Sequence, residues 1–311
     1  MLNKLTALVI ALTLGATLCA SEATAKTFYW ISHGSPADPV WTYFLAGAQQ
    51  WATDTGNQVN TSFHNGDVAA QQETVRIAIA AGAAGIVTSS PDPGSLVQVT
   101  EEANELGIPI VNMNTPDPTA NFDAYVGGDL IDYGRQWAQY LVDKKLVKTG
   151  DFDWLQVEVM GATYGVLEEQ GIASVFEPLG ITWEVTDATL DQGEVITRMV
   201  DYMTANYDKV DAIIGLGDLV TGSIKRVFDQ SGIAPGEIPV VGWGNSLDTT
   251  QEVLLGYVNA AQWQDPQATS YMALTLAAMA ASGIPPGFDI TTGALYEADQ
   301  AQIYDDILSG K

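Results

Sequence analysis

The chain has 311 residues, of which 12 are Lys or Arg and 38 are Asp or Glu, so its formal net charge is −26. Nucleic acids and anionic lipid surfaces need Lys and Arg to neutralise their phosphates, so this composition argues against both as partners. The acidic excess is typical of a solvated surface, and 47% hydrophobic residues in a chain of this length suit two lobes with their own cores.

The first 25 residues are predicted to be a signal peptide. A charged start precedes the apolar residues 5–18, and an Ala-Thr-Ala motif offers a cleavage site after Ala25, so a periplasmic product is expected. The single cysteine, Cys19, lies inside this segment, and the bulky Leu18 before it argues against lipid attachment. The mature chain would therefore contain neither disulfides nor a thiolate metal site. No later stretch is apolar for about 18 residues, so no membrane span is expected.

The rest of the chain alternates short apolar strands with amphipathic helices. Val40, Phe44 and Ala48 fall on one face of a helix predicted over residues 40–56. This alternation predicts parallel sheets with helices on both faces. The order of elements after Asp129 repeats the order before it, which indicates two similar lobes. The expected strands are Thr27–Ser32, Gln58–Phe63, Gly85–Thr88, Pro109–Asn112, Tyr125–Gly127, Phe152–Val159, Thr182–Thr186, Ala212–Leu216, Pro239–Gly242 and Val258–Gln262.

A polar elbow follows the first strand. It runs from His33 through Asp38 to Pro39 and opens onto a helix that Trp41 heads. In open α/β sheets ligands bind just outside the carboxyl ends of strands, so a small molecule is expected at this elbow.

A set of short motifs spans the chain. In chain order they are Asp38-Pro39-Val40-Trp41 with Gly47-Ala48, Ser89-Ser90-Pro91-Asp92-Pro93, Ile108-Pro109-Ile110-Val111-Asn112-Met113-Asn114, Val126-Gly127-Gly128-Asp129, Gly217-Asp218, Val240-Val241-Gly242-Trp243 and Gln264-Asp265-Pro266. Their order and spacing resemble the periplasmic sugar-binding proteins of ABC importers, of the ribose-binding type. The resemblance implies an α/β fold of two similar doubly wound parallel-sheet lobes joined by a three-crossing hinge, the type I periplasmic binding protein or venus flytrap. It also implies a monomer that presents a small carbohydrate to an ABC transporter permease in the inner membrane.

Matching the crossings of this fold places them near Gly128, Gln264 and Asp289. The expected N-terminal lobe then comprises residues 26–128 plus 264–288. The expected C-terminal lobe comprises residues 129–263 plus 289–311.

Residues at the predicted strand ends suit a polyol ligand. Carboxylates, Asn and Gln bind hydroxyls through paired hydrogen bonds, while an aromatic face covers the C–H patches of a sugar. The candidate ligand-binding residues are Asp38, Trp41, Ser90, Asn114 and, as an outside choice, His33 from the N-terminal lobe, Glu168, Asp218 and Asn245 from the C-terminal lobe, and Gln264 at the crossing.

Several candidates have a structural alternative. Trp41 could simply attach its helix to the sheet, and Asp38 and Asp218 could be helix N-caps, because Asp accepts hydrogen bonds from first-turn N–H groups. Asn245 could belong to a turn, Glu168 could be a solvated helix residue, and His33 could be an ordinary loop histidine.

The sequence departs from the ribose-type pattern at its arginines. Positions that commonly carry Arg in that family read Thr115 and Glu168, the strand-end Asp is Asn114, and another Asp is replaced by Gly244-Asn245. Ribose itself is therefore not expected. The remaining arginines, Arg76, Arg135, Arg198 and Arg226, fall in helix-like stretches away from strand ends. An anionic ligand would find no bidentate partner there, so a neutral sugar or polyol is expected.

Three other functions could use features of this sequence. Paired carboxylates such as Asp38 with Asp218 or Glu168 could serve a carbohydrate-processing enzyme, but the sequence has no Gly-x-Ser-x-Gly elbow, metal motif or complete dinucleotide fingerprint. No catalytic residue, metal or cofactor is therefore expected. A sugar-responsive repressor would need a DNA-binding head where the signal peptide stands. A receptor that feeds a chemoreceptor or sensor kinase stays open, because the sequence does not separate sensing from transport.

Overall fold

A computed structural model describes residues 25–90 and 92–311. Except for Ala25, the predicted signal peptide lies outside the described residues, so its cleavage stays a prediction. Within the described part of the chain, no helix is both long and apolar enough to cross a membrane.

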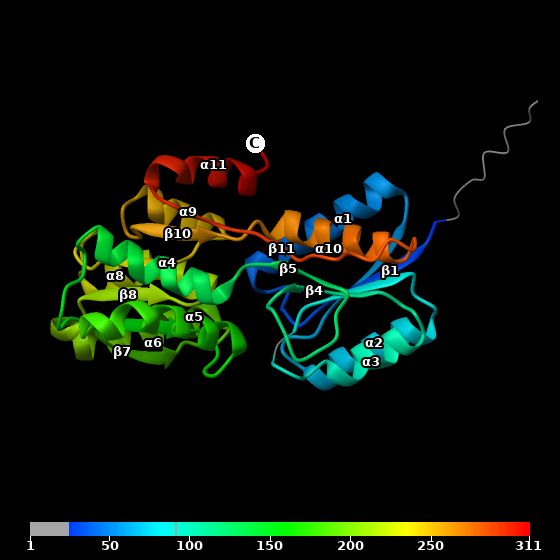
Figure 1. Ribbon diagram of the computed structural model, residues 1–311. Coiled ribbons are helices and arrows are strands. Elements are labelled where there is room, and N and C mark those ends of the chain that lie inside the picture. Colours follow the sequence, from blue (N-terminus) through cyan, green and yellow to red (C-terminus); the bar gives the residue numbers. More distant parts are fainter. Residues whose placement is uncertain (1–24, 91) are drawn as a thin grey trace, which may run out of the picture.

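The fold contains two six-stranded sheets, each with helices on both faces (Figure 1). The first sheet and its helices comprise β1 (Thr27–Ser32), α1 (Pro39–Thr55), β2 (Gln58–Phe63), α2 (Val68–Ala80), β3 (Gly85–Thr88), α3 (Val97–Glu105), β4 (Ile110–Asn114), β5 (Ala124–Gly127), α10 (Pro266–Ala280) and β11 (Ile290–Thr291). Its strand order is β11-β5-β4-β3-β1-β2, and all its neighbours pair in parallel.

The second sheet has the corresponding order β12-β10-β9-β8-β6-β7. Its elements are α4 (Leu130–Asp143), β6 (Phe152–Val157), α5 (Thr163–Phe176), β7 (Thr182–Asp187), α6 (Gln192–Asn206), β8 (Ala212–Gly215), α7 (Asp218–Thr221), α8 (Ile224–Ser231), β9 (Val240–Trp243), α9 (Leu247–Leu254), β10 (Ala260–Trp263), β12 (Ala294–Tyr296) and α11 (Ala298–Ser309). Only β12 pairs antiparallel among the described strands. The predicted fold class, two similar doubly wound lobes of mainly parallel sheet, is confirmed.

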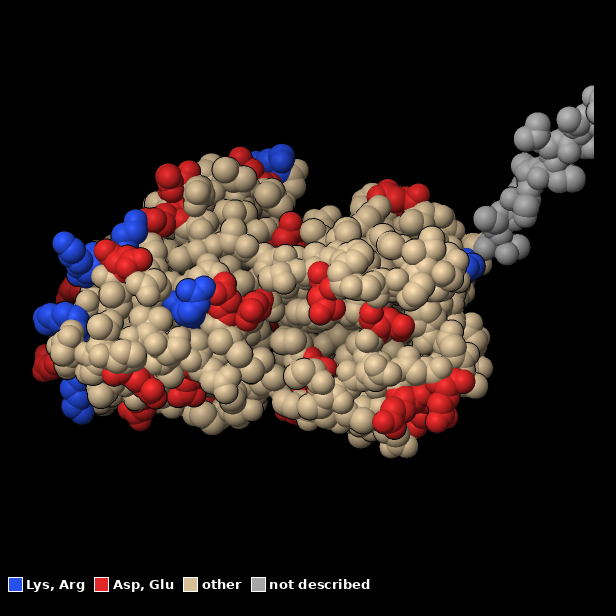
Figure 2. All heavy atoms as spheres, in the orientation of Figure 1, with Lys and Arg blue, Asp and Glu red and all other residues tan. Residues whose placement is uncertain are grey.

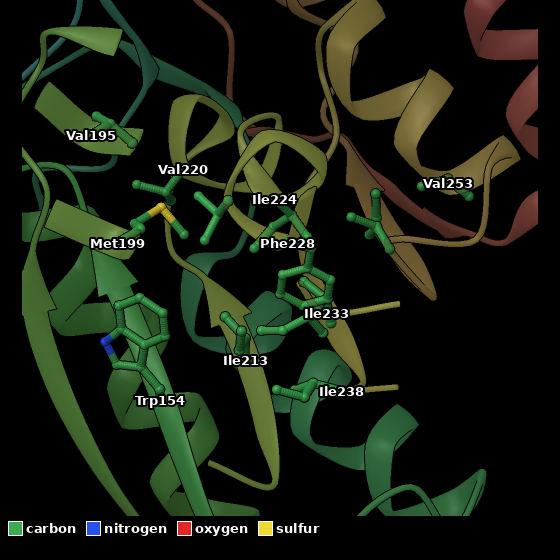
Figure 3. Packing of buried hydrophobic residues seen from close by; sticks show 14 of the residues in the cluster. Trp154, Val195, Met199, Ile213, Val220, Ile224, Phe228, Ile233, Ile238 and Val253 are labelled. Carbon is green, nitrogen blue, oxygen red and sulfur yellow. The ribbon is translucent and has the colours of Figure 1, made fainter. Parts of the chain in front are cut away.

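Each sheet is covered by two separate apolar clusters. In the first sheet, α1 and α10 cover one face and α2 and α3 cover the other. In the second, α4 and α5 lie opposite α6, α8 and α11. Figure 3 shows Trp154 of β6, Met199 of α6 and Phe228 of α8 within one of these clusters. The buried face of α1 carries Trp41 where the predicted apolar stripe had Val40, which is only partly buried.

Five helices begin at an Asp whose side chain accepts a hydrogen bond from a first-turn N–H group. These N-caps are Asp38 of α1, Asp67 of α2, Asp129 of α4, Asp191 of α6 and Asp265 of α10. Each follows the carboxyl end of a strand. The sequence thus places acidic groups where parallel strands end.

Near the predicted third crossing at Asp289, the chain stays with the first sheet for a few more residues. The side chain of Asp289 accepts a hydrogen bond from the backbone N–H of Tyr125, at 2.7 Å, and β11 then pairs with β5. The chain therefore stays with the first sheet through Thr291 and reaches the second through residues 292–293, before β12.

The surface is strongly acidic, and its basic residues are unevenly placed. On the face seen in Figure 2, Lys and Arg lie almost entirely over the half of the molecule that contains the second sheet. Acidic side chains lie over both halves.

Candidate functional site

A cavity of about 280 Å³ lies where the carboxyl ends of strands from the two sheets face each other. Its lining comes from the segments that follow β1, β2, β3, β4, β6, β7, β8, β9 and β10. This is the position at which doubly wound sheets bind ligands.

Most of the predicted site residues line this cavity. They are His33, Asp38, Trp41, Asn114, Asp218, Asn245 and Gln264. The structure brings them together from both sheets, although their part in ligand binding stays a prediction.

Ser90 and Glu168 do not line the cavity. The hydroxyl of Ser90 is buried and donates to the carboxylate of Asp117 at 2.9 Å, which orders the loop after β3. Glu168 is fully buried and accepts a hydrogen bond from the indole Nε1 of Trp243 at 2.9 Å. Direct ligand contact by these two residues has no support in the geometry, because each faces protein groups.

The first-sheet wall of the cavity is built around Trp41. Asp38 caps α1 through a 3.1 Å hydrogen bond from Val40 N, which places Trp41 in the first turn beside the elbow. The indole packs edge-on against His33, with ring centroids 5.0 Å apart. Gly34 permits this arrangement, since a Cβ there would lie 2.1 Å from Cε2 of Trp41. Trp41 therefore combines the predicted attachment of α1 to the sheet with a place in the cavity wall.

His33 faces the cavity as a neutral group. Its Nδ1 lies 2.8 Å from the hydroxyl of Ser89, and burial lowers the pKa of its imidazole to about 4. It can donate or accept one hydrogen bond, but it brings no positive charge at neutral pH.

A chain of hydrogen bonds joins the two sheets across the cavity floor. The Nε2 of Gln264 donates to Oδ1 of Asn114 at 2.8 Å, and its backbone N–H donates to Oδ1 of Asn245 at 2.8 Å. The backbone N–H of Asn245 in turn donates to Oδ1 of Asp218 at 2.6 Å. Four predicted site residues thus form one connected unit, in which Gln264 stands between the sheets.

Glu158 is a cavity residue that the sequence analysis missed. Its carboxyl accepts hydrogen bonds from the hydroxyl of Tyr164 at 2.8 Å and from Leu219 N at 3.2 Å. Burial, with a further contribution from the charge of Asp38, raises its pKa to about 8. The predicted strand ran through Val159 and so placed Glu158 in its interior. The strand in fact ends at Val157, and the rule that ligands bind at strand ends would then have identified Glu158.

Two other acids of the cavity have raised pKa values. Burial, followed by the charge of Asp218, raises the pKa of Asp38 to about 7. Burial also raises the pKa of Asp218, although hydrogen bonds from Ser246, Asn245 and Thr249 oppose the shift. The carboxyl groups of the two walls therefore interact across the cavity.

The aromatic wall extends beyond Trp41. Phe44, Tyr164 and Trp243 also line the cavity, and none of them was predicted there. Trp243 is held by Glu168, which is buried behind the indole and whose pKa burial raises well above its ordinary range. Glu168 thus positions an aromatic cavity residue.

Among its described lining residues the cavity contains no Lys or Arg side chain. The arginines form ion pairs elsewhere, Arg76 with Glu102 and Arg226 with Asp248 for example. Within residues 25–90 and 92–311, no group of three or more His, Cys, Asp or Glu is placed to hold a metal ion. The site therefore offers carboxyl, amide and aromatic groups without a counter-ion for an anionic ligand.

Comparisons with known proteins agree with this arrangement. A solute-binding protein of an ABC transporter from Burkholderia graminis, solved in complex with D-arabinose, has a TM-score of 0.81 at 19% identity, covering 88% of this chain and 96% of that one. A carbohydrate transporter from Acidothermus cellulolyticus in complex with myo-inositol has a TM-score of 0.79 at 16% identity, covering 92% and 99%. A galactofuranose binding protein has a TM-score of 0.82 at 16% identity with the same coverage. At these identities the likeness establishes the fold.

The family itself follows from the sequence match. The family described as "Periplasmic binding protein domain" matches residues 28–285, which is most of the chain and includes strands from both sheets. The chain belongs to this family of periplasmic binding proteins, and it is a binding protein and not an enzyme.

Proposed function

We propose that this protein is the extracytoplasmic receptor of an ABC importer and binds a small carbohydrate, a sugar or polyol, in the cavity between its two sheets. The single observation that carries this proposal is the composition of the cavity wall. Carboxyl and amide groups from both sheets converge there beside Trp41, Tyr164 and Trp243. Such groups bind the hydroxyls and cover the C–H faces of a sugar.

The described cavity lining contains no Lys or Arg, and this restricts the class of ligand that the cavity can bind. Sugar acids and phosphates would enter a cavity that already holds several carboxyl groups, with no described Lys or Arg to pair with them. Solved relatives of the same fold bind D-arabinose and myo-inositol, which carry no charge. A neutral carbohydrate is therefore the proposed cargo.

Binding is proposed to close two lobes around the ligand. The first lobe takes residues 26–128 plus 264–288, with residues 289–291 added because they pair with it, and the second takes residues 129–263 plus the remainder of the chain. Ligand contacts to both lobes would favour the closed form over the open one, which is the differential affinity that a population shift requires. In this proposal the mature protein, cleaved after Ala25, is a monomer in the periplasm. It delivers its ligand to a permease in the inner membrane.

A thermal-shift screen tests the proposed function. The mature chain, residues 26–311, is mixed with aldoses, tetritols, pentitols, hexitols and inositols, with amino acids and nucleosides as other solute classes. A ligand at about 100 times its dissociation constant adds roughly 2.7 kcal/mol of stability, which raises the melting temperature by several degrees. A shift confined to one or a few carbohydrates supports the proposal. Shifts only with other solute classes, or a carbohydrate that is chemically altered, would contradict it.

A further inference from the structure

The cavity has an unbalanced charge. Asp38, Asp92, Glu158 and Asp218 line it, while the only described basic side chain at its wall is His33. Because burial lowers the pKa of His33 to about 4, this imidazole is neutral at physiological pH. The acids of the cavity therefore have no cationic partner among the described lining residues.

Three of these acids face one another. The Oε1 of Glu158 accepts a hydrogen bond from Leu219 N, directly after Asp218 in the chain, and a Cβ at Gly217 would lie 2.0 Å from this oxygen. Glu158 and Asp218 thus lie side by side on the second-sheet wall. Asp38 approaches from the first-sheet wall, closely enough that its charge helps to raise the pKa of Glu158.

The cavity also exposes polar atoms that no described group engages. Asn245 is 2% exposed, and its Oδ1 is occupied by Gln264 N, yet its Nδ2 makes no hydrogen bond to any described residue. The Oε1 of Gln264, itself 2% exposed, is likewise without a described donor, because the amide binds Asn114 through Nε2 only. Polar atoms of this kind, which open onto a cavity, are satisfied by a ligand or by water.

We infer that the cavity also binds carbohydrates in which one hydroxyl is replaced by a protonated amine, and that it binds them more tightly than the matching hydroxyl compounds. This inference rests on the proposed carbohydrate function of the same cavity and extends its ligand range. An ammonium group would donate charge-assisted hydrogen bonds to Asp38, Glu158 and Asp218, and such bonds are stronger than those of a neutral hydroxyl.

Two further features favour an organic cation. The aromatic faces of Trp41, Tyr164 and Trp243 line the same cavity, and aromatic rings attract ammonium groups through their π-electrons. The carboxyl groups come from opposite walls, and the described residues include no cluster arranged for a metal ion. The remaining hydroxyls of the ligand would bind the free amide atoms of Asn245 and Gln264.

The preference should depend on pH. Asp38, Glu158 and Asp218 face one another and Tyr164, and His33 and Asp92 line the same cavity. Glu168 lies close enough to Glu158, and Asp248 close enough to Asp218, for their charges to interact. An ammonium ligand favours the ionised carboxyl groups, whereas a hydroxyl binds both forms. As pH rises through about 7 and about 8, where Asp38 and Glu158 lose their protons, the affinity ratio of amine to hydroxyl ligand should rise.

Isothermal titration calorimetry with matched ligand pairs tests the inference. The mature protein is titrated with D-arabinitol, D-glucitol and D-galactose and with their amino-deoxy analogues, namely 1-amino-1-deoxy-D-arabinitol, 1-amino-1-deoxy-D-glucitol and D-galactosamine. In at least one pair we expect the amine to bind at least about tenfold more tightly than the hydroxyl compound. This is the difference expected when one charge-assisted hydrogen bond replaces a neutral one. The ratio should fall at high salt, which screens charges.

The variant Asp38→Asn keeps a residue that caps helices but removes the charge. It should lower the ratio of amine affinity to hydroxyl affinity about tenfold. Glu158→Gln, on the opposite wall of the cavity, should lower the same ratio independently. The matched control is Asp67→Asn. Asp67 has the same capping role in α2 and lies outside the cavity lining, so the ratio should not change.

The possible results separate the two proposals. If the hydroxyl member binds as tightly as the amine in every pair that binds, the inference is wrong and the carbohydrate function stands. A high ratio that survives both substitutions would also overturn it, because the cavity acids would not be its cause. If neither member of any pair binds, and the wider carbohydrate panel also fails, the proposed function falls and the inference with it.

Discussion

At the scale of single residues, Trp41 combines packing in the core with a place in the cavity wall. The indole is 5% exposed, packs against Trp30 and Phe44, and still forms part of the cavity wall. Its substitution should therefore affect both folding stability and ligand affinity, and a second tryptophan of the same helix allows the two effects to be separated.

Trp41→Ala is expected to weaken ligand binding by about 1 to 3 kcal/mol, because the stacking face is lost. It should also lower the free energy of unfolding by about 3 to 5 kcal/mol, since a buried aromatic is removed. Trp51→Ala is the control, because Trp51 is 2% exposed in α1 and does not line the cavity. Calorimetry should show reduced affinity for Trp41→Ala and unchanged affinity for folded Trp51→Ala. Equal affinities in the two variants would show that Trp41 does not contribute to ligand binding.

Glu158 should make the stability of the unliganded protein depend on pH. Its pKa is about 8 in the folded protein and 4.5 in its ordinary state, so the folded protein holds this proton more tightly than the unfolded chain. The resulting stability is complete below about pH 4.5 and declines as pH rises through about 8. Glu158→Gln should reduce this decline by a few kcal/mol, while Glu73→Gln on the exposed face of α2 should not. Urea unfolding across this pH range measures both, and identical slopes in the Glu158 variant and the wild type would refute the assignment.

The residues of the candidate site could be predicted from the sequence wherever the end of the neighbouring strand could be located. Asp38, Asn114 and Gln264 lie at or after the ends of strands that were predicted to within two residues, and they line the cavity. Glu158 was missed because its strand was drawn too long. The inward position of Ser90 could not be predicted, because it depends on the loop hydrogen bond to Asp117, far along the chain.

At the scale of elements, glycines set how closely the helices pack. A Cβ at Gly134 of α4 would lie 1.9 Å from the carbonyl oxygen of Glu168, and one at Gly171 of α5 would lie 2.0 Å from that of Ile131. The backbones of α4 and α5 therefore touch. Because Glu168 lies on this contact and holds Trp243, the helix pair positions one aromatic wall of the cavity.

Gly171→Ala should force α4 and α5 apart and lower the free energy of unfolding by about 1 to 3 kcal/mol, the usual cost of overpacking. Gly193→Ala in α6 is the matched control, since its Cβ meets only Oδ1 of the N-cap Asp191, at 3.3 Å, a far looser contact than the 2.0 Å at Gly171. There, the gain from replacing a helical glycine should about balance any crowding. Chemical unfolding compares the two, and equal losses would show that the close approach of α4 and α5 does not limit the packing.

The elements themselves were largely predictable because the central strands, such as β3, β8 and β9, are short apolar runs between amphipathic helices. β11 and β12, with two and three residues, were not predicted. Strands so short carry no pattern of their own, and they exist only because β5 and β10 offer free edges to pair with. That tertiary cause also explains why the chain stays with the first sheet past Asp289.

At the scale of the whole molecule, the connections between the sheets are tightly fitted. The hydroxyl of Tyr133 in α4 donates to the carbonyl of Thr292, and its ring fills the space beside Gly128 and Gly293, where a Cβ would lie about 2 Å away. The side chain of Tyr133 thus contacts two of the three connections between the sheets. Gln264, at the other connection, binds Asn114 of the first sheet and Asn245 of the second.

Gln264→Ala should weaken ligand binding and also reduce the compaction that ligand causes, because the link between the sheets is cut. Small-angle scattering of the wild type with and without ligand gives the reference change in radius of gyration. Asp265→Asn, next in the chain and a helix cap outside the cavity lining, is the control for α10. A wild type whose radius does not change on ligand addition would count against hinge closure itself, whatever the variant does.

The central claim is that one small carbohydrate binds, unchanged, in the cavity between the sheets. Calorimetric titration of residues 26–311 with the carbohydrate found by the thermal-shift screen, followed by mass spectrometry of the recovered ligand, tests it most directly. The account predicts one ligand per chain, recovered intact, and weaker binding when Trp41 or Gln264 is replaced. Absence of binding by any sugar or polyol, or recovery of a chemically altered ligand, would contradict it.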